Sequence, residues 1–174
     1  ERDINFGTRS EENAERSLLL YRDSFGEALI PLLSTNLGRA VYSQEFPYNL
    51  ELNDESYDMI MIELVERNIP NLLTGAPLMQ ASEKQLPTDA VSVSCTANAQ
   101  KRSGFTQLYG SIAAYPAAER IYIEVACTDG AVRVYEAFPV NDSGDADPAW
   151  ESASGYLLTL PEGIEGEVSG AYIG

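Results

Sequence analysis

One stretch of sequence decides the fold of the first part of this chain: Leu18-Leu19-Leu20-Tyr21-Arg22-Asp23-Ser24-Phe25-Gly26-Glu27-Ala28-Leu29-Ile30. It opens with a continuous apolar run, which is typical of a strand buried on both faces of a parallel sheet. The run ends on Asp23-Ser24 and a glycine, after which the apolar spacing becomes that of a helix. Such a turn puts Ser24 at the edge of the sheet, where its hydroxyl could attack an ester and its backbone N–H could bind an oxyanion.

The surrounding residues predict a parallel α/β arrangement. Residues 1–16 are polar and lack periodicity, so we expect an extended lead-in. We expect strands at residues 17–22, 39–44 and 57–64, and helices at 25–36 and 65–73. Pro31 interrupts the first helix, which is tolerable only within its first turn or two. Three strands and two short helices cannot cover both faces of a parallel sheet, so we expect something else to complete it.

A change of periodicity divides the chain. Thr74-Gly75-Ala76-Pro77 is a break, after which apolar residues recur at every second position, as in Ile121, Ile123, Val125 and Cys127. Further strand candidates lie at residues 91–95, 105–112, 132–134, 153–160 and 167–173. We therefore predict a partial three-layer α/β domain over residues 1–78. An antiparallel β-sandwich should follow from about Leu86, in a second domain over residues 79–174, with few contacts between the two.

Composition excludes several classes of function. The 174 residues carry a net charge of −16, which argues against a nucleic-acid partner and against binding to anionic lipid. No apolar run approaches the ~18 residues of a membrane span, so we expect no transmembrane segment. The chain starts at Glu1 without methionine, so we expect a processed product or a piece of a longer protein.

Two interpretations of Ser24 follow from its position. It could be a nucleophile, because ligands of parallel sheets bind at the carboxyl ends of strands, or it could simply cap the helix that follows. Arg67 and Asn68 follow the third strand and Gln44 ends the second, so with Asp23 they are candidates for the same cleft or oxyanion site; Ser43 is a weaker one. Arg67 could instead pair with Glu66 on the surface. The chain has no histidine, so it cannot be an ordinary Ser-His-Asp enzyme.

The second half offers weaker signals. Residues 141–147 are rich in oxygen ligands but fail the EF-hand pattern, so we expect an acidic loop and no metal site. Cys95 and Cys127 share the apolar phase of their strands, which leaves a disulfide and two free core thiols both open. The aromatic residues could form a sugar-stacking platform or be ordinary strand residues: Tyr109, Tyr122, Tyr135, Tyr156 and Trp150.

The Asp-Ser stretch, the apolar helix after it and Asp58-Met59-Ile60-Met61-Ile62-Glu63-Leu64-Val65-Glu66-Arg67-Asn68 resemble the carboxyl-terminal half of the catalytic domain in the bacterial DHHW family. That family is similar to the alginate O-acetyltransferases, which have an SGNH-hydrolase-like fold. The resemblance covers about residues 15–73 and implies that Ser24 is the nucleophile, with Asp and His partners on an upstream motif outside this chain. Arg22 stands where classical SGNH enzymes have the glycine of Gly-Asp-Ser. The resemblance also implies a carboxyl-terminal carbohydrate module.

These observations predict part of an exported or cell-envelope SGNH-like acyltransferase or esterase. Its partner would be an acetylated sugar or polysaccharide, and it would use no cofactor. The upstream half of the same protein would supply the base, so residues 1–174 alone should be catalytically silent. The alternative is a non-catalytic cell-surface protein whose second domain binds glycan or another protein.

Overall fold

A computed structural model of the chain describes residues 5–11, 15–51, 56–113, 120–141 and 154–174. The chain forms two compact units, residues 1–69 and residues 70–174. The division falls inside the 3-10 helix η2 (Glu66–Leu73), earlier than the residue-78 boundary that the change of periodicity predicts. Leu73, Ala76 and Leu78 are buried, so this stretch is part of a folded unit and not an exposed linker.

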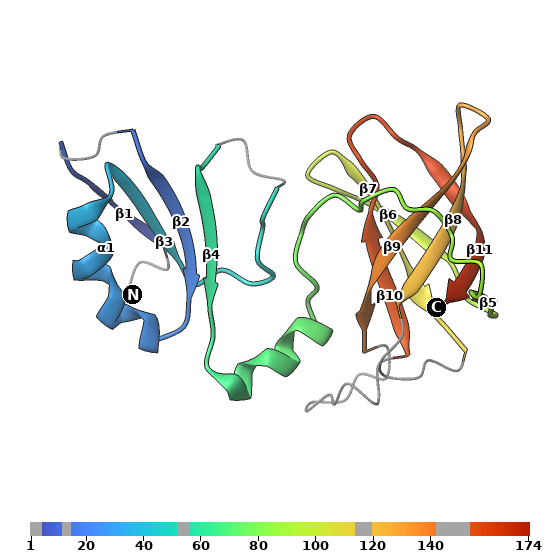
Figure 1. Cartoon of the computed structure of the whole chain (residues 1–174), viewed down its shortest axis with the longest axis horizontal. Helices are drawn as coiled ribbons and strands as arrows, with labels where there is room; N and C mark the ends of the chain where they lie inside the picture. The colour runs from blue at the N-terminus through green and yellow to red at the C-terminus, as the bar shows by residue number, and fades with distance from the viewer. Residues whose placement is uncertain (1–4, 12–14, 52–55, 114–119, 142–153) are drawn as a thin grey trace. The chain divides into compact units, whose positions relative to one another are not determined.

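The first unit contains a four-stranded mixed sheet with the order β1-β3-β2-β4 (Figure 1). Its strands are β1 (Asn5–Arg9), β2 (Ser17–Arg22), β3 (Arg39–Ser43) and β4 (Met59–Glu63). β2 pairs in parallel with both β3 and β4, which confirms the predicted parallel trio. β1 pairs antiparallel with β3, so the predicted lead-in is a strand and the sheet is mixed.

The segment after β2 begins as a 3-10 helix, η1 (Phe25–Leu29), and continues as α1 (Ile30–Asn36). We predicted one helix over the whole segment. Pro31 explains the difference, because it lies in the first turn of α1, where its missing N–H breaks no helical hydrogen bond. Proline is therefore accommodated by starting the α-helix at Ile30.

The two faces of the first sheet are covered differently. Leu18 and Leu20 of β2 form a core with Ala40 and Tyr42, and α1 packs on it through Ile30 and Leu33. On the opposite face, Tyr21 lies against Tyr48, with ring centroids 5.3 Å apart, and its hydroxyl donates to the Asn49 carbonyl at 2.7 Å. A loop segment, and not a helix, covers the sheet at Tyr21, so the described residues do not complete a three-layer arrangement there.

The second unit is an antiparallel sheet of seven strands with the order β5-β11-β8-β9-β10-β7-β6 (Figure 1). The strands are β5 (Val91–Ser92), β6 (Asn98–Arg102), β7 (Phe105–Ser111), β8 (Ile121–Cys127), β9 (Val132–Val140), β10 (Gly155–Thr159) and β11 (Gly166–Ile173). The antiparallel prediction is confirmed. β6 was not predicted, because its sequence, Asn98-Ala99-Gln100-Lys101-Arg102, is polar and fully exposed.

One segment covers both edges of this sheet. Residues 91–92 pair with β11, residues 98–102 pair with β7, and between them Cys95 bridges Ile112. The sheet therefore closes on itself through residues 91–102, where we had predicted a sandwich of two sheets. Gly110 permits this crossing, because a Cβ there would overlap the carbonyl oxygen of Thr96. The closure is partial, because β11 meets β5 only at Tyr172 and Ile173.

Both cysteines of the second unit are free thiols that lie in or against its apolar core cluster. Cys127 is buried, and Cys95 is half-buried and packs against the same core. The disulfide alternative is therefore wrong, and the two-thiol alternative holds. None of the helices in the described part of the chain combines the length and apolar character needed to cross a bilayer.

Candidate functional site

Ser24 lies at the carboxyl end of β2, the strand between β3 and β4 in the first sheet. It is exposed, its backbone is helical (φ −66°, ψ −22°), and its side chain makes no capping hydrogen bond. The helix-cap interpretation of the Ser24 hydroxyl is therefore not supported. The hydroxyl is open to solvent next to the first turn of η1.

Asp23 makes the contacts that hold this turn. One carboxylate oxygen accepts a hydrogen bond from the Phe25 N–H at 2.8 Å. The other accepts from the Val65 N–H at 3.0 Å and from the Asn68 side-chain amide at 3.3 Å. One carboxylate thus joins the end of β2 to the segment that follows β4. The two clusters that we predicted at one edge of the sheet do lie together.

These donors change the acidity of Asp23. The Val65 N–H is the largest influence, followed among the favourable ones by the Phe25 N–H, and together they lower the pKa of Asp23 against the opposing effect of burial. Asp23 is therefore a weak base at neutral pH, and its oxygens are already occupied. It positions the turn and does not accept the Ser24 proton.

Gly26 and Glu63 complete the packing below the turn. A Cβ at Gly26 would lie 2.7 Å from the Arg22 Cβ and 2.7 Å from a Glu63 carboxylate oxygen, so only glycine fits. Glu63 also accepts a hydrogen bond from the Asp23 N–H at 3.4 Å. Arg22 is 6% exposed; one guanidinium nitrogen donates to the Asp23 carbonyl at 3.0 Å, and the guanidinium lies 5.7 Å from the Phe6 ring centroid.

The remaining predicted site residues are placed less directly. Arg67 is exposed and its guanidinium lies 5.5 Å from the Phe25 ring centroid; among the described ion pairs there is none with Glu66. Gln44 is exposed just beyond β3, and in the described structure no hydrogen bond joins it to Ser24 or Asp23. Ser43 is buried and accepts a hydrogen bond from the Glu45 N–H at 3.1 Å. Of the candidates Gln44, Arg67 and Asn68, Asn68 is the one whose side chain hydrogen-bonds to the turn in the described structure.

Sequence reasoning missed Tyr48 at this site. Its side chain is 7% exposed, and its pKa is raised first by burial and then by the charges of Asp23 and Glu63. No spacing rule connects a tyrosine in the loop after β3 with the end of β2, so no sequence signal identifies it. Glu63 was recognisable, because it ends the third predicted strand at the same edge.

The arrangement can present a serine hydroxyl but does not activate it. Nucleophilic serine needs a neighbouring group that takes its proton. The lowered pKa of Asp23 and the raised pKa of Tyr48 both make these residues poor acceptors at neutral pH. No group of three or more metal-ligating side chains is found among the described residues.

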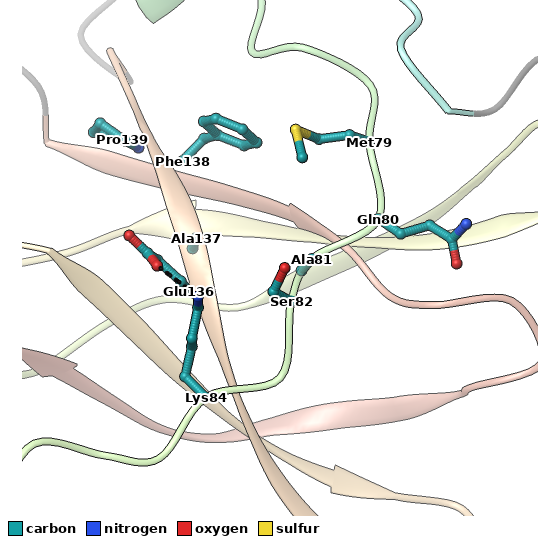
Figure 2. A pocket seen from close by; sticks show the side chains of 9 residues that line it. All are labelled: Met79, Gln80, Ala81, Ser82, Lys84, Glu136, Ala137, Phe138 and Pro139. Atoms are coloured by element: carbon teal, nitrogen blue, oxygen red, sulfur yellow. Dashed lines mark ion pairs between the residues drawn. The ribbon is translucent and has the colours of Figure 1, made fainter. Parts of the chain in front are cut away.

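The second unit carries a pocket of about 220 Å³ between β9 and residues 79–84 (Figure 2). Residues 79–84 lie beside β9 and β10, with the Ala81 and Lys84 N–H groups donating to the Thr159 and Val134 carbonyls, both at 2.8 Å. Lys84 and Glu136 form an ion pair at 3.7 Å across the pocket. The lining is apolar at one end and polar at the other: Met79, Gln80, Ala81, Ser82, Lys84, Glu136, Ala137, Phe138 and Pro139.

Of the two interpretations of the tyrosines, the structure favours ordinary strand residues over a sugar platform. Tyr122, Tyr135 and Tyr156 are 6%, 1% and 0% exposed, so their rings cannot stack on a sugar. Burial raises the pKa of Tyr156 to about 12. Of the predicted platform only Tyr109 reaches the surface in the described residues; Trp150 and the acidic loop at 142–147 lie outside them.

Comparison of the chain with protein-family models, with curated proteins and with solved structures gave no match.

Proposed function

We propose that Ser24 is the nucleophile of an SGNH-like acyl-transfer site in an exported or cell-envelope protein that acts on acetylated polysaccharide. The observation that carries the proposal is the free, exposed Ser24 hydroxyl at the carboxyl end of a parallel strand, on a turn held by the Asp23 carboxylate. A residue that only capped a helix would use its hydroxyl for that purpose. In this turn the Asp23 carboxylate accepts the hydrogen bond from the Phe25 N–H instead.

The proposed reaction has two steps. The Ser24 hydroxyl oxygen attacks the acyl carbonyl carbon of a sugar ester while a base takes its proton, and the tetrahedral intermediate expels the sugar oxygen, which receives that proton. Water or the hydroxyl of a second sugar then attacks the acyl-serine and releases Ser24. Water gives an esterase and a sugar hydroxyl gives a transferase.

The base would come from outside residues 1–174, because the chain has no histidine. Proton transfer by a positioned base contributes roughly 10²- to 10⁴-fold to such reactions, so residues 1–174 alone are expected to be inactive. The Ser24 N–H lies at the start of η1 and is the oxyanion donor that this chain would contribute. Asn68 and Asp23 act as positioning residues.

Labelling of the complete gene product with a fluorophosphonate probe tests the proposal. We expect the probe on the peptide that contains Ser24, and none in Ser24→Ala. Ser56→Ala is the matched control, because Ser56 is also an exposed serine of the first unit. Labelling that persists in Ser24→Ala, or none in the wild-type product, would overturn the proposal.

A second arm uses residues 1–174 alone with an activated acetyl ester. We expect the same rate for the wild-type chain and for Ser24→Ala, because Asp23 and Tyr48 are poor proton acceptors. Turnover that depends on Ser24 would mean that the base lies within this chain, and the part of the proposal that assigns the base to another segment would be wrong.

The alternative function is glycan binding by the second unit, and the pocket beside β9 favours it. Phe138 and Met79 give an apolar surface for the C–H face of a sugar ring, while Glu136 and Ser82 offer hydrogen-bonding groups beside it. NMR titration with acetylated and deacetylated oligosaccharides tests this function. Phe138→Ala should weaken binding about tenfold, or 1.4 kcal/mol, and Val132→Ala, at an exposed position of the same strand, should not. Equal effects of the two changes would exclude the pocket.

A further inference from the structure

β4 has the sequence of an interior strand but lies at an edge of its sheet (Figure 1). Four consecutive apolar residues, Met59-Ile60-Met61-Ile62, are typical of a parallel strand covered on both faces. In-register residues of β2, its neighbour, are buried, with Leu18, Leu19 and Leu20 at 1%, 5% and 0% exposed. On β4 the corresponding Met59, Ile60 and Met61 are 54%, 36% and 37% exposed.

The exposure affects both faces of β4. Successive side chains of a strand point to opposite faces, so Met59 and Met61 share one face and Ile60 lies on the other. Within the described residues, β4 pairs only with β2, and its outer backbone groups form no ladder. The outer edge therefore combines unpaired backbone with apolar side chains, which is the combination that natural sheets usually avoid.

The opposite edge of the same sheet shows what a protected edge looks like. β1 has the sequence Asn5-Phe6-Gly7-Thr8-Arg9, with alternating exposure and only one large apolar side chain. That side chain, Phe6, stacks on Tyr42 with ring centroids 5.0 Å apart. The contrast within one sheet indicates that the apolar surface of β4 is a property of that edge, and not of the unit as a whole.

Two more exposed apolar side chains lie on the segments that follow β2 and β4. Phe25 is 59% exposed and Ile69 is 40% exposed, and the Arg67 guanidinium lies over the Phe25 ring. Exposed apolar side chains gathered on one strand edge mark an interaction site more often than an accident of composition. Phe25 and Ile69 lie on the two segments that the Asp23 carboxylate holds together.

Charge decides the kind of partner. Asp58 precedes β4, Glu63 ends it and Glu66 follows it, so both ends of the strand are acidic. Asp58 accepts two hydrogen bonds from Ser17, both at 2.7 Å, which lower its pKa and keep it charged. A second copy paired antiparallel on β4 would bring Glu63 of each copy toward Asp58 of the other, between chains of net charge −16 each. A partner with basic ends avoids this repulsion.

We propose that β4 is a docking edge for an extended, apolar segment of another polypeptide with basic residues at both its ends. The segment adds a strand to β4, so that its backbone pairs with the free edge and its side chains cover Met59, Ile60 and Met61. Its basic ends lie near Asp58 and Glu63. This surface is independent of the Ser24 hydroxyl, so it goes beyond the proposed function.

Binding of a synthetic peptide tests the proposal. The probe is a short peptide of alternating valine and isoleucine with lysines at both ends. One control peptide has glutamates in place of the lysines, and a second keeps the lysines but has glycine and serine between them. Fluorescence anisotropy gives the affinity, and amide hydrogen exchange of β4 gives the site.

We expect the lysine-ended apolar peptide to bind and to slow exchange of the β4 amides. The affinity of each control peptide should be lower by roughly tenfold or more, because each lacks one of the two complementary features. Met61→Lys should reduce binding by a similar factor, since a charge on an edge strand opposes strand addition. Leu32→Lys is the matched variant, because Leu32 is 66% exposed on α1 of the same unit, and it should leave binding unchanged.

Three results would overturn the proposal. The first is equal binding of the lysine-ended peptide with a glycine-serine centre, which would mean attraction by charge alone. The second is binding that is insensitive to Met61→Lys or that leaves the β4 amides unprotected. The third is self-association of the chain in sedimentation experiments that Met61→Lys abolishes, which would assign the edge to a second copy. Ser24→Ala should leave peptide binding unchanged, so this test and the test of the proposed function can fail separately.

Discussion

The two units of this chain solve the problem of sheet edges in opposite ways. In the second unit residues 91–102 pair with both β11 and β7, so one segment joins the two ends of the sheet. In the described part of the first unit β4 pairs only with β2, and Met59 and Met61 are exposed. The second unit therefore buries most of its own apolar surface, whereas the first leaves the apolar side chains of β4 exposed, where a further element can cover them.

The cores differ in the same direction. Among the described residues, the core cluster of the second unit contains thirteen buried residues and that of the first contains four. Burial of apolar area is the main favourable contribution to folding, so the first unit should be the less stable one by itself.

The largest effect is expected from equivalent core truncations, Leu20→Ala and Ile123→Ala. Each side chain is 0% exposed, and each change should cost about 2 to 5 kcal/mol. We expect the loss to unfold the first unit but only to weaken the second. Native-state hydrogen exchange of the two sheets measures this. If Ile123→Ala unfolds its unit while Leu20→Ala leaves the first unit protected, the ranking of the two units is wrong.

The closure of the second sheet is tested by Gly110→Ala. The added methyl group would overlap the Thr96 carbonyl and push residues 91–102 away from β7, at a cost of about 1 to 3 kcal/mol. Gly104→Ala is the control: its φ of 84° gives backbone strain, but no atom lies within 4 Å of the new Cβ. Chemical denaturation compares them. A larger loss in Gly104→Ala would contradict the close approach at Gly110.

The turn of the first unit is tested by Asp23→Asn, which should cost about 1 kcal/mol at neutral pH. The pKa of Asp23 is lowered in the folded chain, so its stabilising contribution is present above the unfolded pKa of about 3.9 and is lost as the pH falls through the folded value. Asp23→Asn should therefore flatten the acid side of the stability profile of the first unit. Asp89→Asn, at an exposed aspartate of the second unit, is the control. An unchanged acid slope in Asp23→Asn would show that the carboxylate bonds contribute nothing.

The smallest effect is expected from reducing agent. Cys95 and Cys127 are free thiols, so the closure of the second sheet owes nothing to a disulfide. The unfolding midpoint should be the same with and without reductant, measured by thermal denaturation. A lower midpoint in reductant would mean that a disulfide contributes to the stability of the second unit after all.

Much of the first unit could be predicted because its information is local. The run Leu18-Leu19-Leu20 and the change of spacing after Gly26 predict β2, its burial on both faces and the helix after it, and the structure has them in place. β1 could not be predicted, since Asn5–Arg9 is polar and becomes a strand only by pairing with β3. The candidate site divides in the same way. The edge position of Ser24 follows from its neighbours in sequence, whereas the fold alone buries Tyr48 and brings it within reach of the Asp23 charge, both of which raise the pKa of Tyr48.

Sequence by itself determined the parallel strands of the first unit and the antiparallel pairing of the second, because periodicity reports which faces of a strand are apolar. It also determined the acidic surface and the absence of a histidine base. Tertiary structure alone decided that Asp23 joins the turn to Val65, that residues 91–102 pair with both β11 and β7, and that an interior-type strand such as β4 lies at an edge beside β2. These are contacts between residues distant in the chain. Their geometry depends on how whole strands are ordered, which no local pattern of side chains encodes.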